Sequence, residues 1–223
     1  MDYRIISIGT LSHHELWSEN QHQRTPHATT TLIRSRERVI LVDPGLPPPV
    51  IVARLKERSG LEPEAITDVF LTNFRPAHRW GLEAFAHAKW LISDMEREVI
   101  GTMLIDQVKQ EQEPDRQKAL ELDLTILKRC QAAPDRFVDQ VDLFPLPGFT
   151  PGTCGLLLLH TNATTLVAGD AVATSEHMER GQVLRSSYDV GQARESMMEA
   201  IEIADVLIPG HDNLLLNPTR RPL

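Results

Sequence analysis

The feature that most constrains the fold is a repeated pattern in which a short aliphatic run leads into a polar loop that contains glycine. Such runs are typical of buried strands, and their alternation with helical segments predicts a layered α/β architecture. Loops at strand ends are held by a rigid sheet and usually carry the functional residues of a protein. Five loops of this kind are therefore candidates for such residues: 42–45, 71–81, 147–152, 169–170 and 209–212.

The segments between these loops predict the order of the elements. A helix that opens at Pro47 is expected to end near residue 58, because Gly60 can adopt the positive φ of a helix C-cap. Polar residues with spaced leucines predict two helices within 95–129, joined near Pro114. Strands are expected at 1–9, 29–33, 38–42, 69–72, 144–146, 156–159, 165–167 and 206–208, and a last helix at 192–204.

Charge, hydropathy and repeats exclude several classes of protein. The chain has 23 Lys and Arg against 31 Asp and Glu, a net charge of −8, whereas nucleic-acid-binding proteins concentrate positive charge. No apolar run exceeds four residues, although about 20 are needed to span a bilayer, and no signal-peptide pattern opens the chain. We therefore expect a cytoplasmic protein with no nucleic-acid or membrane partner. No repeat or linker interrupts the pattern, so residues 1–223 are interpreted as one domain.

In their order along the chain, the five loops resemble the metallo-β-lactamase-fold hydrolase superfamily. Residues 42–45 resemble its Asp-x-Gly element, and residues 71–81 resemble its Thr-His-x-His-x-Asp-His-x-x-Gly signature. Residues 147–152 resemble its Pro-Gly-His-Thr-Pro-Gly, and Asp170 and His211 match its bridging aspartate and last histidine. The resemblance implies an α/β (α+β) fold of the four-layer αββα sandwich type.

The sequence departs from the family at the positions that hold the first metal ion. The two histidines of His-x-His and the histidine of Pro-Gly-His are replaced by Asn73, Arg75 and Phe149. Zinc needs three or four nitrogen, oxygen or sulfur ligands, and an amide, a guanidinium and a phenyl ring provide no such set. The first ion is therefore expected to be lost.

The positions of the second ion are better preserved. The family's ligands there are matched by Ala77, His78, Asp170 and His211, so three of the four remain. Two imidazoles and one carboxylate suit zinc, iron or manganese with coordination positions left open. The resemblance thus implies at most one divalent ion, and a protein without metal stays an open alternative.

Two further roles follow from these matches. Because Ala77 lacks the carboxylate that would orient or deprotonate water in the family, Asp170 or Asp212 is left as a catalytic base. Asp43 is expected to orient a ligand histidine or to fix the Pro44-Gly45 turn.

Arg75 offers an alternative that needs no metal. If its guanidinium points inward, it lies near the position of the first ion, can pair with Asp170 and repels a divalent cation. Trp80 and Phe149, together with Arg75 and Arg79, predict a partly aromatic, cationic cleft for a small anionic ligand. The sequence therefore supports two functions: a single-metal hydrolase acting on an ester, lactone or thioester, or a metal-free ligand-binding or regulatory module without catalysis.

Overall fold

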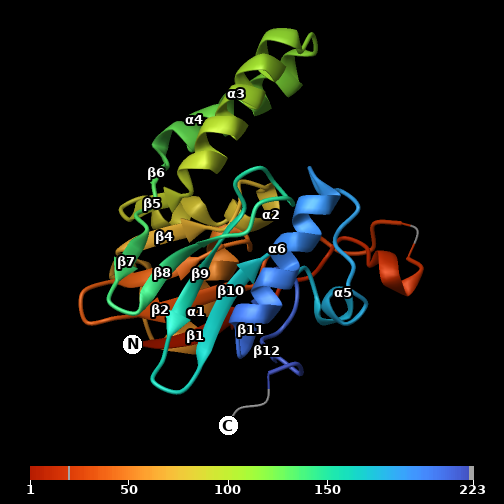
Figure 1. Cartoon of the computed structure of the whole chain (residues 1–223). Helices are drawn as coiled ribbons and strands as arrows, with labels where there is room; N and C mark the ends of the chain where they lie inside the picture. The colour runs from red at the N-terminus through yellow and green to blue at the C-terminus, as the bar shows by residue number, and fades with distance from the viewer. Residues whose placement is uncertain (20, 221–223) are drawn as a thin grey trace.

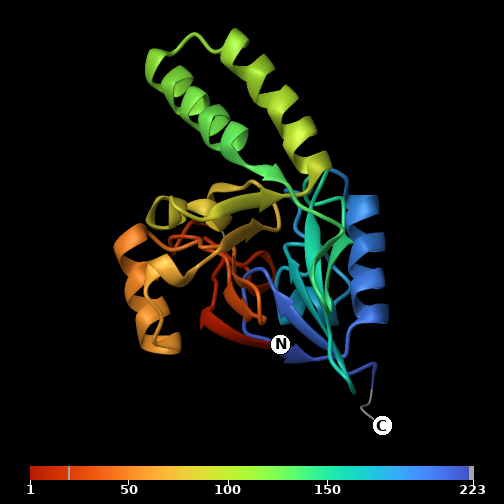
Figure 2. The same ribbon diagram turned by 90° about the vertical axis from the view of Figure 1, so that its left-hand side faces the viewer.

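Two β-sheets packed face to face, with helices on their outer sides, form the body of the protein. The computed structural model describes residues 1–19 and 21–220. In Figure 2, α1 (Pro48–Ser59) flanks the sheets on the left and α6 (Val190–Ile203) flanks them on the right. The expected four-layer αββα sandwich is confirmed.

Each sheet is built from one half of the chain, and its strands are neighbours in sequence order (Figure 1). The first sheet contains β1 (Asp2–Ser7), β2 (Thr30–Arg34), β3 (Val39–Val42), β4 (Asp68–Leu71), β5 (Lys89–Ile92) and β6 (Gln131–Ala132). The second contains β7 (Arg136–Val138), β8 (Val141–Pro145), β9 (Cys154–Leu159), β10 (Thr164–Gly169), β11 (Val206–Pro209) and β12 (Leu215–Leu216). The remaining elements are α2 (Pro76–Arg79), α3 (Asp94–Gln110), α4 (Pro114–Arg129), α5 (Ser175–Glu179) and the 3₁₀ turns η1 (Glu15–Trp17), η2 (Pro63–Ala65) and η3 (Leu82–Phe85).

The aliphatic runs are continuous because the central strands are covered on both faces. Ile40 and Val42 of β3 pack between the two sheets, whereas Leu41 between them packs on the outer side with α1. In β10, Val167 faces the other sheet and Leu166 packs toward α6. Since successive side chains of a strand point to opposite faces, both faces of each central strand must be apolar.

The helix boundaries follow the sequence signals. Helix α1 ends at Gly60, which has the positive φ of 73° that was expected of its C-cap. Helix α4 begins with Pro114, and the two predicted helices form a hairpin, α3 and α4, that projects from the sandwich (Figures 1 and 2). Strand β8 begins at Val141, earlier than expected, because its half-buried Asp142 pairs with Arg136 of β7 and extends the ladder.

Parallel strand pairs in both sheets carry the loops singled out in the sequence. β3 and β4 are parallel in the first sheet, and β10 and β11 are parallel in the second. Parallel strands end at the same edge of a sheet. Asp43 and residues 72–75 therefore leave the first sheet side by side, as do Asp170 and residues 210–212 in the second.

In the part of the chain that the structure describes, no helix has both the length and the apolar character that crossing a membrane requires.

The loop after β8 must fit closely against α6. Gly148 has a φ of +129°, and a Cβ atom on it would lie 2.2 Å from the backbone nitrogen of Ala193. Gly148→Ala is therefore expected to lower the free energy of unfolding by at least about 2 kcal/mol. Urea denaturation followed by circular dichroism measures this change.

Gly101→Ala is the matched control. Gly101 lies within α3, where an added Cβ would meet only the Leu127 side chain at an ordinary 3.6 Å. Because alanine favours helix over glycine, we expect this variant to be neutral or up to about 1 kcal/mol more stable. Equal free energies of unfolding for the two variants would contradict a tight fit of the loop against α6.

Candidate metal centre

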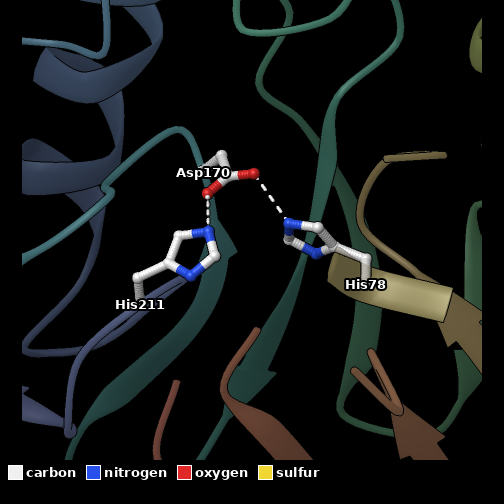
Figure 3. A group of neighbouring side chains, drawn as sticks. All are labelled: His78, Asp170 and His211. Atoms are coloured by element: carbon white, nitrogen blue, oxygen red, sulfur yellow. Dashed lines mark hydrogen bonds and ion pairs between the residues drawn. The ribbon is translucent and has the colours of Figure 1, made fainter. Parts of the chain in front are cut away.

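Three side chains from the two halves of the sandwich meet in its interior (Figure 3). His78 lies in α2 after β4, Asp170 follows β10 and His211 follows β11. One nitrogen or oxygen atom from each lies within 4.8 Å of the other two, so the group could hold a metal ion. The three residues are only 0, 3 and 8% exposed, which shields the group from solvent.

The two ring nitrogens of His78 face two different carboxylates. Nδ1 lies 3.0 Å from Oδ2 of Asp43, and the nearby Thr72 hydroxyl donates to the same oxygen. Nε2 lies 2.7 Å from Oδ2 of Asp170. Both carboxylates can only accept, so the ring donates to each of them when both nitrogens are protonated. With a metal ion on Nε2, the remaining hydrogen lies on Nδ1 and is donated to Asp43.

His211 is oriented in the same way by backbone carbonyls. Its Nδ1 lies 3.1 Å from the carbonyl oxygen of Thr10 and 3.0 Å from that of His27. Carbonyls also accept only, which assigns the hydrogen to Nδ1. Nε2 then carries a lone pair that faces Oδ1 of Asp170 at 3.0 Å.

When both rings are neutral with the hydrogen on Nδ1, the lone pairs of two imidazoles face the two oxygens of one carboxylate. Within the described residues, Oδ1 of Asp170 is buried with no hydrogen-bond partner. Such contacts are unfavourable unless a proton or a cation lies between them. The set of two histidines and one carboxylate also matches catalytic zinc sites, whose ligands surround the ion about 3.3 Å from one another. The residues present therefore fit a divalent ion.

Without an ion, a proton on His78 fulfils the same role. Burial alone would lower the pKa of His78, but the Asp170 and Asp43 carboxylates reverse this effect and raise the pKa to about 10. Burial would raise the pKa of Asp170, but His78 and His211 hold that pKa well below its usual range. A proton and a metal ion therefore compete for the same nitrogen.

Backbone features support the close approach of these groups. Asp43 has a positive φ of 50°, which is uncommon outside glycine, and its Oδ1 accepts from the Thr72 backbone nitrogen at 2.9 Å. Gly210 precedes His211, and a Cβ on it would lie 2.6 Å from Oδ1 of Asp170. Glycine is therefore needed there. Asp43 contacts the histidine that it was expected to orient.

Asn73 bonds directly to the group. Its Nδ2 donates to Oδ2 of Asp170 at 3.1 Å and lies 3.2 Å from Nε2 of His78. Its Oδ1 accepts from the Arg75 backbone nitrogen at 3.0 Å. A residue that the resemblance assigns to the lost first ion thus bonds to the carboxylate that the resemblance assigns to the second. Ala77 occupies the position of the fourth ligand that the sequence lacks. Its carbonyl oxygen accepts from the Ala28 backbone nitrogen at 2.8 Å.

The pairing of Arg75 with Asp170, one of the two orientations that the sequence leaves open, does not form. Among the described residues, Arg75 makes no ion pair; its side chain is exposed, with Cζ 5.5 Å from the centroid of the Phe149 ring. The cause is local, because Arg75 is extended before Pro76, with φ −63° and ψ 146°, and stands outside the turn that carries His78 inward.

The predicted aromatic and cationic cleft does not form as expected. Phe149 is buried in an apolar cluster with Ala173, Leu184 and Leu11. Trp80 is exposed and lines a cavity beside α4. Arg79 is already paired, because it donates to the Phe74 carbonyl at 2.9 Å and lies 2.7 Å from Asp123.

The two candidate bases are both engaged. Asp170 directs its two oxygens at imidazoles, and its lowered pKa makes it a weak proton acceptor. Asp212 accepts from the backbone nitrogen and hydroxyl of Ser175 at 3.1 and 2.6 Å, at the start of α5. The geometry of Asp170 therefore suits a ligand, and Asp212 stabilises a helix terminus.

Glu96 is an important residue that the sequence did not single out. Its fully buried carboxylate accepts from the backbone nitrogens of Phe74 and Gly152, each at 2.9 Å. It thereby ties the loop after β4 to the loop after β8. Glutamate three residues after Ser93, the N-cap of α3, is the pattern of an ordinary capping box, so the sequence carries no specific signal for this bridge.

The raised pKa of His78 predicts how the stability of the metal-free protein depends on pH. The pKa of His78 is about 10 in the folded state, against 6.5 for an unperturbed histidine, so its stabilisation is complete below pH 6.5 and is lost as the pH rises toward 10. The melting temperature of protein treated with a chelator is therefore expected to fall over this range. His78→Gln, which cannot titrate there, should show a smaller fall; parallel curves would contradict the protonated state of His78.

Comparison with known proteins shows the family to which the chain belongs. The family model described as the Metallo-beta-lactamase superfamily matches residues 25–211. No curated protein matches the sequence.

Similar solved structures include AidC, described as a dizinc quorum-quenching lactonase in complex with a product, with 17% identity, a TM-score of 0.69, and coverage of 85% of this chain and 74% of that chain. The hydrolase AbOPH of the beta lactamase superfamily has 14% identity and a TM-score of 0.64, covering 99% and 91% of the two chains. An AiiA mutant from B. thuringiensis with N-decanoyl-L-homoserine at its active site has 19% identity and a TM-score of 0.65, covering 94% and 92%. At these identities the likeness concerns the fold.

Proposed function

Because the chain belongs to the metallo-β-lactamase superfamily, we propose that it is a hydrolase that uses one divalent ion held by His78, Asp170 and His211. We further propose an ester, lactone or thioester as its substrate. AidC and AiiA, two of the structural neighbours, are described with acyl-homoserine molecules bound or as a lactonase, which supports this substrate class.

The observation that carries the proposal is the orientation of the two histidines. Nδ1 of each ring faces an acceptor of its own, Asp43 for His78 and backbone carbonyls for His211. Each then directs Nε2 at Asp170. Metal-ligating histidines almost always have such a partner on the second nitrogen, because it fixes the tautomer and raises the basicity of the ligand.

A single ion is proposed because the other ligand positions are otherwise engaged. Phe149 lies in an apolar cluster, Arg75 is exposed, and Asn73 donates its amide to Asp170. This differs from AidC, whose description names two zinc ions.

Each residue of the group would have a separate role in holding the ion. A divalent ion held here would supply Lewis-acid polarisation of a carbonyl and would lower the pKa of a water molecule. His78 and His211 bind it through Nε2, and Asp170 balances its charge. Asn73 keeps one oxygen of Asp170 in place through its amide.

A second candidate function is supported by the low exposure of the group. With His78 protonated, one positive charge lies between the carboxylates of Asp43 and Asp170 and compensates part of their charge without a metal ion. In this case the protein would bind a ligand without hydrolysing it. Metal content and hydrolysis separate the two candidates.

Metal analysis tests the ligand set. Wild-type protein, purified without affinity metals and supplied with zinc, iron or manganese, is expected to hold about one ion per chain. Asp170→Asn is expected to abolish binding, and Asp43→Asn to weaken it by about 10- to 100-fold, because Asp43 orients a ligand from outside. Elemental analysis and isothermal titration calorimetry measure these changes.

Asp189→Asn is the matched control for these substitutions. Asp189 caps α6 through a bond to the Gln192 backbone nitrogen, and asparagine caps equally well, so its metal content should equal that of the wild type. A wild-type protein without metal under replete conditions would favour the second candidate. Two ions per chain would contradict the single-ion proposal.

Hydrolysis is tested with a panel of esters, lactones and thioesters of different chain length. The metal-loaded protein is expected to release acid from at least one class, and a chelator is expected to remove this activity. His211→Ala should be inactive, because it removes one of three ligands. His87→Ala is the control, since His87 bonds to the Ile66 carbonyl outside the group; acid release that persists in chelator would exclude a metal-dependent reaction.

A further inference from the structure

A separate cavity lies between the loop that follows β4 and helix α3. Its volume is about 180 Å³, and its walls include the apolar side chains of Phe74, Ile100, Met103 and Leu104. The hairpin of α3 and α4, which projects from the sandwich in Figures 1 and 2, provides one side of it. The cavity is therefore a largely apolar space next to the loop that carries Asn73 and His78.

The buried charged groups along this cavity are already satisfied. Glu96 accepts from two backbone nitrogens, those of Phe74 and Gly152. Arg79 is paired with Asp123 and also donates to a carbonyl. These groups have little capacity left for a ligand.

Arg75 is different. Its side chain lines the cavity and is exposed. In the described part of the chain, its guanidinium makes neither a hydrogen bond nor an ion pair, and its Cζ lies over the face of Phe149 at 5.5 Å from the ring centroid. A guanidinium is always charged and has five N–H donors in a planar fork that suits carboxylate and phosphate oxygens. An anionic group is the partner that these free donors fit.

The volume limits the size of that partner. A space of about 180 Å³ corresponds to roughly six water volumes in the liquid, and pockets for drug-sized molecules begin at about 300 Å³. The apolar walls favour a hydrocarbon or aromatic body over a sugar, because burying hydroxyl groups without partners is costly.

We propose that this cavity binds a compact apolar anion, with its hydrocarbon or aromatic body between Phe74, Ile100 and Leu104 and its carboxylate or phosphate on Arg75. The site is separate from the group of His78, Asp170 and His211. It needs no metal ion and goes beyond the proposed hydrolysis. Trp80 takes no part in it, in contrast to the cleft that the sequence predicts.

The test measures binding to metal-free protein, so its result is independent of the proposed hydrolase activity. Hexanoate and phenyl phosphate serve as the two anionic probes, and hexanol and phenol as neutral probes of similar shape. Isothermal titration calorimetry in the presence of chelator is expected to show binding of at least one anion and at least about tenfold weaker binding of its neutral counterpart. The stronger of the two anions identifies carboxylate or phosphate as the preferred group.

Variants locate the site. Arg75→Ala is expected to weaken binding of the anion by at least about tenfold, with partial recovery in Arg75→Lys, which keeps the charge but not the fork. Met103→Trp, which fills the cavity from an exposed position on its rim, is expected to abolish binding. Arg116→Ala, an exposed arginine of α4, is the control and should bind as the wild type does.

Each contrary result overturns the proposal. Equal binding of the anion and its neutral counterpart would show that the charge of the ligand does not contribute to binding. Unchanged affinity in Arg75→Ala would show that Arg75 does not bind the anion. Failure of both anions to bind at millimolar concentration would exclude the site. Circular dichroism and melting temperature confirm that each variant is folded, and Leu104→Phe replaces Met103→Trp if the latter does not fold.

Discussion

The buried carboxylate of Asp170 is the interaction on which the rest of the interior depends. It lies between His78, which belongs to the first half of the chain, and His211, which belongs to the second. A charge removed from water in this way must be compensated, and leaving it unpaired would cost about 3–5 kcal/mol. The two sheets are thus joined by apolar packing along their length and by a charged contact at the edge where their parallel strands end.

The same carboxylate explains why the site accommodates either a proton or a metal ion. In both imidazoles Nδ1 lies next to an acceptor of its own, so Nε2 is the nitrogen that faces Asp170. A proton on His78 neutralises one contact but leaves the lone pair of His211 opposite Oδ1, which has no hydrogen-bond partner among the described residues. A divalent ion would satisfy both contacts at once, which is the physical reason for preferring the metal-dependent function.

The sequence predicts the fold well because its signals are local. Continuous aliphatic runs such as 39–42 can be buried on both faces, and Gly60 and Pro114 mark helix ends without reference to the rest of the molecule. The order of the loops then indicates that His78, Asp170 and His211 come together, as they do. Outside the loops, Thr10 and His27 carry no comparable signal, because backbone carbonyls orient His211 irrespective of side chain.

What the sequence predicts poorly is the direction of side chains within a loop. Arg75 and Asn73 are two residues apart, yet Asn73 is buried against Asp170 whereas Arg75 is exposed. Burying a guanidinium beside His78 would place two positive groups around one carboxylate, with little solvent to screen them. Asn73 donates a hydrogen bond to Asp170 without that charge, so the amide is the less costly neighbour.

The short helix α2 separates the exposed Arg75 from the buried His78. Pro76 fixes the first turn of α2, which leaves Arg75 extended before it and places His78 on the buried side. Glu96 accepts from the backbone nitrogen of Phe74, the residue before Arg75, and this bond stabilises the loop in this orientation. The polar group therefore lies on the inner face of this loop, and the apolar cavity with its free guanidinium lies on the other.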